Sequence, residues 1–395
     1  MIGFDKACAL ITALPERTGT ELLALSKAQG RVLAHDVMAG VDAPRSNCSA
    51  MDGYAVREAD LARLPSRLNI AGACYPGQQT LLMVPAGSCA RIFTGATVPT
   101  GLDRIIVQEE VSVQDGEALF EHPLGQARHI RKQGSDFWAG DKLLLAGTRL
   151  DARGMLAAAA SDNALFEVHR KPRVLVLGLG DELCAPGTAR DSVAGIPESV
   201  SYGVAGMVEQ WGGDCLHRTR LPDDLDELQS AAGDNLEEAD LIIVSGGASV
   251  GERDFAKAMF VPHGLELIFS KVAIKPGKPV WLGRAKEKLV LGLPGNPSSA
   301  LVCARLFLAP LLLRLSGAPP HAAWRWKQSP LAAGLDPGTE RETFVRARWS
   351  KGRVQPLTDP DSSAQKTLAQ ADVLIRRKPR ASALDTGQCV EVLEF

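Results

Sequence analysis

A glycine-rich segment at residues 245–254 has the composition of an anion-binding loop. It reads Ser-Gly-Gly-Ala-Ser-Val-Gly-Glu-Arg-Asp and follows an apolar run. Glycines let backbone N–H groups approach an anion closely, and Asp254 at the end could hold a metal ion. The segment matches neither a Walker A loop nor a dinucleotide-binding fingerprint, and a plain strand-to-helix turn is the alternative interpretation. The candidate phosphate contacts are Ser245, Gly246, Gly247, Ser249 and Gly251.

Three lysines, Lys271, Lys275 and Lys278, lie within eight residues of a loop that two prolines and a glycine stiffen. Ammonium groups that converge from a rigid loop suit a phosphate or another oxyanion, because lysine acts there as a point charge. A solvated basic turn is the alternative interpretation, and the sequence alone leaves both open.

The segment 293–298 reads Leu-Pro-Gly-Asn-Pro-Ser and lies between an apolar run and a long helical pattern. Its residues Pro294, Gly295, Asn296 and Pro297 would lie at a helix N-terminus, where free N–H donors and the helix dipole favour an anion. An ordinary helix start with proline in the first turn explains the same residues, and taken singly we favour it.

Paired carboxylates follow another apolar run in Gly180-Asp181-Glu182-Leu183. Mg²⁺ takes one or two carboxylates together with phosphate oxygens, so this pair could bind it; a solvated acidic helix start is the alternative. Three further segments, at residues 48–56, 93–96 and 134–136, carry polar side chains to which spacing assigns no chemistry, and each is typical of a turn.

Buried strands and helices alternate between Pro172 and Leu315. The runs 173–177, 241–244 and 288–291 predict strands, and the patterns 199–211 and 298–315 predict helices. This alternation predicts a parallel α/β sheet, in which ligands bind beyond the carboxyl ends of the strands. The glycine-rich and acidic segments follow those strands.

The rest of the chain predicts an α/β plus β protein of several domains. Helical patterns at 5–30 and 151–166, the second with Asp151 as N-cap, bracket a β-rich stretch. We therefore expect four domains: a helical linker domain from 1–46 and 137–170, an inserted β-rich domain at 47–136, an α/β domain at 171–317 and a C-terminal β-barrel domain at 318–395.

Composition excludes several classes of protein. The 395 residues carry 44 basic and 46 acidic side chains, a net charge of −2, which disfavours a nucleic-acid binder that relies on bulk positive charge. Eight scattered cysteines form no metal-binding spacing and are too sparse for a disulfide framework, so a cytoplasmic location is expected. The longest apolar stretch, 300–318, is interrupted by Arg305 and Arg314, which argues against a membrane span.

Six segments in order resemble the molybdopterin molybdenumtransferase family, which includes MoeA and the E-domain of gephyrin. The matches are SAMDGYAV at 49–56, FTGA at 93–96, GDEL at 180–183, SGG.SVGE.D at 245–254, K.AIKPGKP at 271–279 and LPGNP at 293–297. Each motif alone is modest evidence, whereas six at matching separations are very specific. The resemblance covers nearly the whole chain and is weakest after residue 320.

The resemblance implies that molybdate is inserted into the dithiolene of adenylylated molybdopterin, with release of AMP and a requirement for Mg²⁺. It implies a molybdopterin-binding α/β domain of the MogA type and a homodimer with a composite active site. It also suggests the molybdopterin adenylyltransferase and molybdoenzyme chaperones as partners. Neutralising phosphate charge and positioning the substrates would drive such a reaction.

The resemblance also implies roles for single residues. Glu182 and Asp254 fall on metal positions, Lys271 and Lys275 near molybdate and phosphate, and Pro294 and Pro297 beneath the pterin. Further substrate positions fall on Asp52, Thr94, Asp136 and Asp223. A looser alignment assigns Arg346 and Ser362 to molybdate, and Lys278 belongs to the same basic loop.

Three departures from the family pattern weaken this assignment. Leu179 replaces a threonine, Val200 an asparagine, and Asp361 adds a carboxylate that would repel molybdate. A paralogue that binds or delivers the cofactor without catalysis is therefore the alternative function. An unrelated nucleotide-dependent enzyme is disfavoured by the lack of a Walker or dinucleotide loop.

Overall fold

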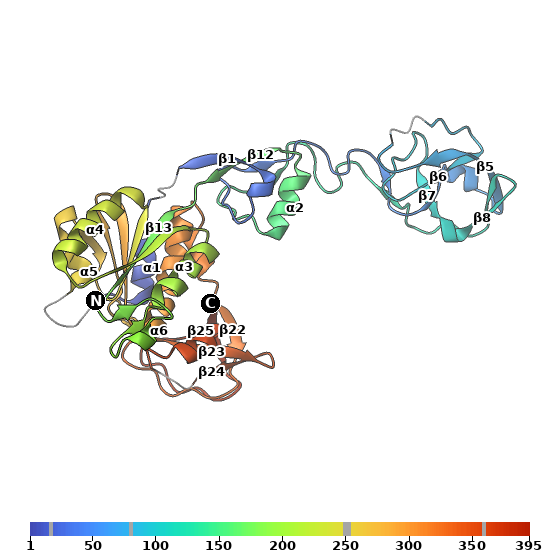
Figure 1. The fold of residues 1–395 in the computed structure, drawn as a ribbon. Helices are drawn as coiled ribbons and strands as arrows, with labels where there is room; N and C mark the ends of the chain where they lie inside the picture. Colours follow the sequence, from blue (N-terminus) through green and yellow to red (C-terminus); the bar gives the residue numbers. More distant parts are fainter. Residues whose placement is uncertain (16–18, 79–81, 248–253, 358–360) are drawn as a thin grey trace.

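The computed structural model describes residues 1–15, 19–78, 82–247, 254–357 and 361–395. Figure 1 shows an elongated chain whose two ends both lie on one large body. That body holds the α/β domain and, beside it, the C-terminal β domain. A narrow middle domain leads from the body to a separate β domain at the far end.

A six-stranded sheet in the order β16-β13-β17-β21-β20-β18 forms the centre of the α/β domain. The strands β16, β13, β17 and β21 pair in parallel, as expected for the three predicted runs among them, whereas β20 pairs antiparallel with both of its neighbours, β21 and β18. The reason is a hairpin turn at Lys286 and Glu287, whose φ angles of 43° and 65° suit a tight connection. The strands are β13 (Arg173–Leu179), β16 (Asp214–Leu221), β17 (Leu241–Ser245), β18 (Glu266–Phe269), β20 (Trp281–Ala285) and β21 (Lys288–Leu293).

Helices cover both faces of this sheet, and each face has its own aliphatic core. The first core contains buried residues of α1 (Phe4–Thr12), α3 (Val200–Gln210), α6 (Pro297–Cys303) and α7 (Ala309–Leu315). A π-helical turn at residues 304–308 connects α6 to α7. The second core contains buried residues of α4 (Leu225–Glu238) and α5 (Phe255–Ala258). Among the described residues, the helix Pro297–Leu315 alone is long and apolar enough for a membrane span, and 89% of it is buried inside the protein.

The first helix is shorter than expected and packs elsewhere. It ends at Thr12 rather than near residue 30, and Phe4, Ala7 and Ile11 lie in the α/β core instead of the middle domain. Leu22 and Leu23 belong to a strand, where neighbouring side chains point to opposite faces. Helical spacing over so short an apolar stretch did not distinguish these two structures.

The middle domain is built from two small antiparallel pairs and one helix. Here β1 (Thr20–Ala24) pairs with β12 (Leu165–His169), and β2 (Val37–Met38) pairs with β11 (Lys142–Leu144). Asp151 caps α2 (Ala152–Ala160), since its carboxylate accepts the N–H groups of Arg153 and Gly154, as expected. The helix ends at residue 160 rather than at the expected residue 166, and residues 165–169 form a strand instead.

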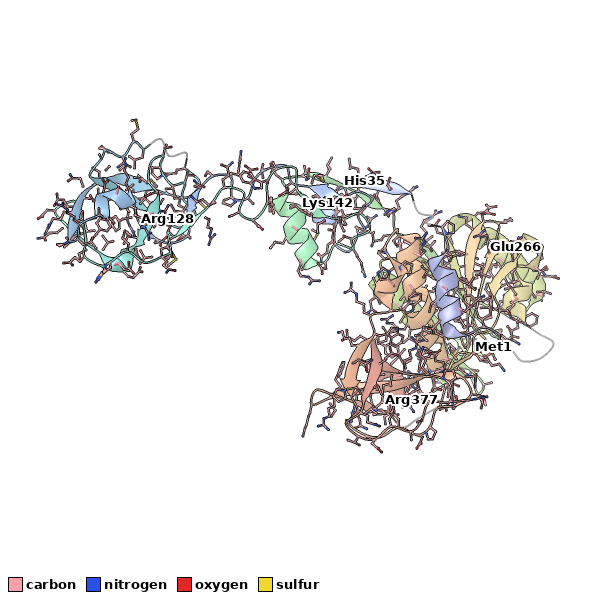
Figure 2. All side chains as sticks on the ribbon, turned by 180° about the vertical axis from the view of Figure 1, so that it is seen from behind. Met1, His35, Arg128, Lys142, Glu266 and Arg377 are labelled. Carbon is pink, nitrogen blue, oxygen red and sulfur yellow. The ribbon has the colours of Figure 1, made fainter. Side chains whose placement is uncertain are left out.

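The inserted domain is a six-stranded sheet in the order β7-β4-β6-β5-β9-β8. Its strands are β4 (Gly53–Val56), β5 (Ser66–Cys74), β6 (Ser88–Ile92), β7 (Arg104–Val107), β8 (Val111–Gln114) and β9 (Glu117–Phe120). A short pair, β3 (Cys48–Ser49) with β10 (Ile130–Arg131), lies where the chain enters and leaves. Figure 2 shows Arg128 in the inserted domain, well separated from Glu266 and Arg377 on the main body.

The C-terminal domain is a small sheet that closes on itself. The order β19-β23-β25-β26-β22 carries β24 beside β23, and a bridge between Leu331 and Val354 joins the end of β22 to β24. This closure agrees with the expected barrel. The first strand in that order, β19 (Ile274–Lys275), comes from the α/β segment, so the basic loop belongs to both domains. The others are β22 (Lys327–Pro330), β23 (Glu342–Ser350), β24 (Arg353–Pro356), β25 (Val373–Arg377) and β26 (Cys389–Glu394), with α8 (Gln365–Ala369) alongside.

Candidate active site

A cleft of about 960 Å³ opens at the carboxyl ends of the parallel strands. The loops that follow β13, β16, β17 and β21 all reach it, because parallel strands end at the same edge of the sheet. The structure therefore brings together segments that lie far apart in the sequence. The predicted residues that line this cleft are Glu182, Asp223, Ser245, Gly246, Gly247, Pro294, Gly295, Asn296 and Pro297.

Close backbone packing explains the glycines of this cleft. Gly246 has a φ of +88°, and a Cβ there would lie 2.3 Å from the carbonyl oxygen of Leu179. A Cβ on Gly295 would lie 3.2 Å from the Cα of Gly246. The loops after β13, β17 and β21 thus touch through their backbones, and no larger residue fits at position 246 without a shift.

The acidic pair joins two loops at the mouth of the cleft. Asp181 accepts the backbone N–H of Asp223 at 3.0 Å, which ties the loop after β13 to the loop after β16. Glu182 lines the cleft, and its carboxylate folds back over Gly180, where a Cβ would lie 2.6 Å from Oε2. Asp181 therefore holds the loops, whereas Glu182 faces the space that a substrate would fill.

Asp254 directly precedes Phe255, which lines the same cleft. Its carboxylate is paired with the ammonium group of Lys257, and its Oδ1 is buried without a hydrogen-bond partner in the described parts of the chain. The described residues contain no group of three or more metal-ligating side chains. This donor set fits Mg²⁺ that arrives with substrate phosphates, because Mg²⁺ often uses one or two carboxylates, whereas it lacks the ligands of a closed metal site.

The replaced positions Val200 and Leu179 have structural explanations. Glu198 accepts the N–H and hydroxyl of Ser201 at 2.7 and 2.5 Å, so it caps α3 without help from residue 200. Val200 lines the cleft and packs against the first core, while Leu179 is buried beside Gly247. Both substitutions make the wall of the cleft more apolar.

A second cleft of about 540 Å³ adjoins the first. Pro279 lines both clefts, and the amide of Asn296 donates to the hydroxyl of Ser362 at 2.9 Å where they meet. Lys275, Lys278, Arg346 and Ser362, all predicted from the sequence, line the second cleft. It therefore gathers positive charge next to the glycine-rich loops.

The guanidinium of Arg346 is buried and used within the protein. Its Nη1 donates to the hydroxyl of Ser298 at 2.7 Å and to the carbonyl of Ala364, and its Nη2 donates to the carbonyl of Asp361 at 3.0 Å. The carboxylate of Asp361 accepts the N–H of Ser363, and this hydrogen bond lowers the pKa of the Asp361 carboxyl. Arg346 thereby connects the start of α6 to the loop 361–364.

Four predicted residues lie apart from the two clefts. Lys271 is exposed, and its carbonyl accepts the N–H of Ile2, but its side chain lines neither cleft. Asp136 is exposed on the connection to the inserted domain. Asp52 and Thr94 lie in the inserted domain, which is at the end of the molecule opposite the two clefts (Figure 1). There the N–H and the hydroxyl of Thr94 donate to the carboxylate of Asp52 at 2.7 and 2.8 Å. Those bonds lower the pKa of the Asp52 carboxyl.

Two predicted contacts, Ser249 and Gly251, lie outside the described residues. Conversely, Arg341 and Thr343 line the second cleft, and Ser363 and Gln365 line the first, although the motifs did not single them out. These residues lie in the region where the sequence resembles the family least. Only the pairing of β19 with β23 brings Arg341 and Thr343 beside Lys275.

Three family models match the chain in order. "MoeA N-terminal region (domain I and II)" matches residues 2–161, "Probable molybdopterin binding domain" matches 175–314, and "MoeA C-terminal region (domain IV)" matches 328–395. A MoeA protein structure from Pyrococcus horikoshii is 28% identical, covers 100% of this chain and 99% of its own, and superimposes with a TM-score of 0.79.

Relatives with assigned names agree with these matches. The molybdopterin molybdenumtransferase of Haemophilus influenzae is 36% identical over 354 residues, which cover 89% of this chain and 86% of the relative. Molybdopterin molybdenumtransferase 2 of Mycobacterium tuberculosis is 33% identical and covers 89% of each chain. With its loops assembled into two adjoining clefts, this chain belongs to the molybdopterin molybdenumtransferase family, whose members take part in molybdenum cofactor biosynthesis.

Proposed function

We propose that this protein inserts molybdate into adenylylated molybdopterin and releases AMP. The observation that carries the proposal is the junction of the two clefts at Pro279, where glycine-rich loops meet a basic wall. Both substrates are anionic, so a site for them needs N–H donors and cations side by side.

Each cleft suits one substrate. The loops of Gly246, Gly247 and Gly295 would face the phosphates of adenylylated molybdopterin with their backbone N–H groups. Lys275 and Lys278 would hold molybdate in the second cleft through charge. The catalytic demand is to position the two anions and neutralise their charge while the bond between the two phosphates breaks.

Glu182 and Asp254 would hold Mg²⁺, which would supply further neutralisation of the phosphate charge. The Oδ1 of Asp254, which has no hydrogen-bond partner among the described residues, supports this role, and so does the position of Glu182 on the cleft wall. Lys257, which pairs with Asp254, would hold that carboxylate in place.

We also propose a homodimer whose active site combines two subunits. Asp52 and Thr94 cannot reach the α/β clefts of their own chain in this structure, because the inserted domain lies at the opposite end (Figure 1). The middle domain exposes leucines that a second copy would cover, and these are Leu22, Leu145, Leu156 and Leu165, at 54–74% exposure.

A cytoplasmic location is part of the proposal. All eight cysteines of the chain are free thiols, which fits a reducing compartment.

The test is an assay for AMP release from adenylylated molybdopterin, with molybdate and Mg²⁺ each present or omitted. Release that needs both supports the proposal. Tight molybdopterin binding without AMP release would instead favour a paralogue that delivers the cofactor. Glu182→Gln and Lys275→Ala should lose activity while they keep the melting temperature. Glu266→Gln and Lys6→Ala, at exposed positions outside the clefts, serve as matched controls.

The composite site has its own test. Asp52→Asn and Glu182→Gln subunits, each inactive alone, are mixed and allowed to exchange. In a composite dimer the mixed species regains one intact site, so about a quarter of the wild-type activity should return if half of the dimers are mixed. No recovery in demonstrably mixed dimers would refute the shared site.

A further inference from the structure

We propose that Lys257 competes with the divalent cation for Asp254, so that the metal enters this site together with the substrate phosphates rather than before them. This inference rests on the proposed function, in which Glu182 and Asp254 hold Mg²⁺. It makes Lys257 a positioning residue, which acts on the metal through the carboxylate that it holds.

The ammonium group of Lys257 already neutralises the carboxylate of Asp254. Lys257 lies three residues after Asp254, in the short helix α5, and its Nζ donates to Oδ2 of that carboxylate. The two side chains are 21% and 37% exposed, so water screens their attraction less than it would on an open surface. One oxygen of Asp254 therefore carries a cation, whereas Oδ1 is buried without a hydrogen-bond partner in the described parts of the chain.

A second contact keeps the ammonium close to this carboxylate. The Nζ of Lys257 lies 5.7 Å from the centre of the Trp281 ring, within the range of a cation–π interaction. Trp281 is 1% exposed on β20, and Gly292 on the neighbouring strand makes room for it, since a Cβ there would lie 1.9 Å from the indole Nε1. The fixed ring therefore holds the ammonium beside Asp254 even when that carboxylate binds a metal.

The charges of the first cleft link metal entry to the phosphates. Among the described residues that line it, the charged side chains are all carboxylates, those of Glu182, Glu198 and Asp223. A divalent cation that bound Asp254 in the empty cleft would lie beside the ammonium of Lys257, and like charges at short range repel. Phosphate oxygens offset this repulsion, because they ligate the metal and also attract an ammonium group. Metal and phosphates should therefore favour each other's binding.

The experiment measures Mn²⁺ binding to the full-length protein, without nucleotide and with saturating AMP, from the electron paramagnetic resonance signal of free Mn²⁺. Mn²⁺ replaces Mg²⁺ because it accepts the same oxygen ligands. Without AMP, Lys257→Met should bind Mn²⁺ about tenfold or more tightly than wild type, since the competing charge is gone. With AMP the gain should be smaller, because the phosphate already offsets the ammonium in the wild type.

Two further replacements separate the charge of Lys257 from its packing. Lys257→Arg keeps the positive charge and should bind Mn²⁺ within about threefold of wild type. Lys257→Gln loses the charge but keeps a hydrogen-bond donor, so it should gain affinity as Lys257→Met does, and it repeats the test if Lys257→Met fails to fold. A purely structural role would instead weaken Mn²⁺ binding in both neutral variants, because Asp254 would lose its support.

Lys288→Met is the matched control. Lys288 pairs with Asp240 at 3.9 Å, and these side chains are 27% and 26% exposed, but Lys288 begins β21 and so lies at the edge of the sheet opposite the cleft. Its replacement should leave Mn²⁺ binding unchanged. The gain must also depend on Asp254, so Asp254→Asn/Lys257→Met should bind Mn²⁺ no more tightly than Asp254→Asn.

The inference is overturned if Lys257→Met binds Mn²⁺ no more tightly than wild type, if its gain is equal with and without AMP, or if the gain survives in Asp254→Asn. These measurements need no turnover. A wild-type protein that binds Mn²⁺ at Asp254 but releases no AMP would count against the proposed function alone. Mg²⁺-dependent AMP release, combined with unchanged Mn²⁺ binding by Lys257→Met, would count against this inference alone.

Discussion

Replacement of Gly246 by alanine tests whether close backbone packing shapes the first cleft. The added Cβ would lie 2.3 Å from the carbonyl oxygen of Leu179, and the φ of +88° is one that residues with side chains rarely adopt. The backbone conformation alone costs about 1–3 kcal/mol, and the clash forces the loop after β17 to move. That loop also contacts Gly295, so the glycine-lined wall of the first cleft should shift.

We therefore expect Gly246→Ala to reduce the free energy of unfolding by about 2–3 kcal/mol. This corresponds to a fall of about 4–12 °C in the melting temperature of a domain of this size. The affinity for AMP should fall as well, because the loop no longer presents its N–H groups correctly. Scanning calorimetry and titration with AMP measure the two effects.

A matched control comes from Gly206, which lies inside α3 with no atom within 4 Å of the position of an added Cβ. Gly206→Ala should stabilise the protein by about 0.5–1 kcal/mol, since alanine favours helix, and should leave AMP binding unchanged. If Gly246→Ala melts at the wild-type temperature and binds AMP normally, the packing argument for this cleft is wrong.

Two other variants probe carboxylates whose pKa is lowered. Thr94→Val removes the hydroxyl but not the backbone N–H that donates to Asp52, so the pKa of Asp52 should rise part of the way toward its ordinary value in a carboxyl NMR titration. Because the pKa of Asp52 is depressed in the native protein, the hydrogen bonds of this carboxylate stabilise the fold above about pH 3.9, and this stabilisation is lost as the pH falls through the native pKa. The Thr94→Val variant should therefore lose less stability than the wild type over the same fall in pH. Among the described residues, Asp361 carries the one carboxylate that lines the second cleft. Asp361→Asn removes it and keeps an acceptor for the N–H of Ser363, so the KM for molybdate should fall by about 2–5-fold; an unchanged KM would mean that this charge does not reach the anion.

Local sequence determined the main elements of the α/β domain. The apolar runs that begin at Arg173, Leu241 and Lys288 are strands, and the long pattern to Leu315 is a helix, because a strand or helix buried on its contact faces must be apolar there. Because these strands were expected to be parallel, their glycine-rich and acidic loops were expected at one edge of the sheet. The amino-acid sequence was therefore sufficient to predict the first cleft.

Only the tertiary structure decided which of the predicted residues line a cleft. Arg341 and Arg346 both line the second cleft, but the closing of the C-terminal sheet buries Arg346 among oxygens and leaves Arg341 partly exposed. The packing of α1 on the α/β core and the hairpin between β20 and β21 likewise depend on distant partners. Motif spacing indicates which residues follow a strand. The burial and the hydrogen bonding of each side chain, by contrast, depend on contacts between segments that are far apart in the chain.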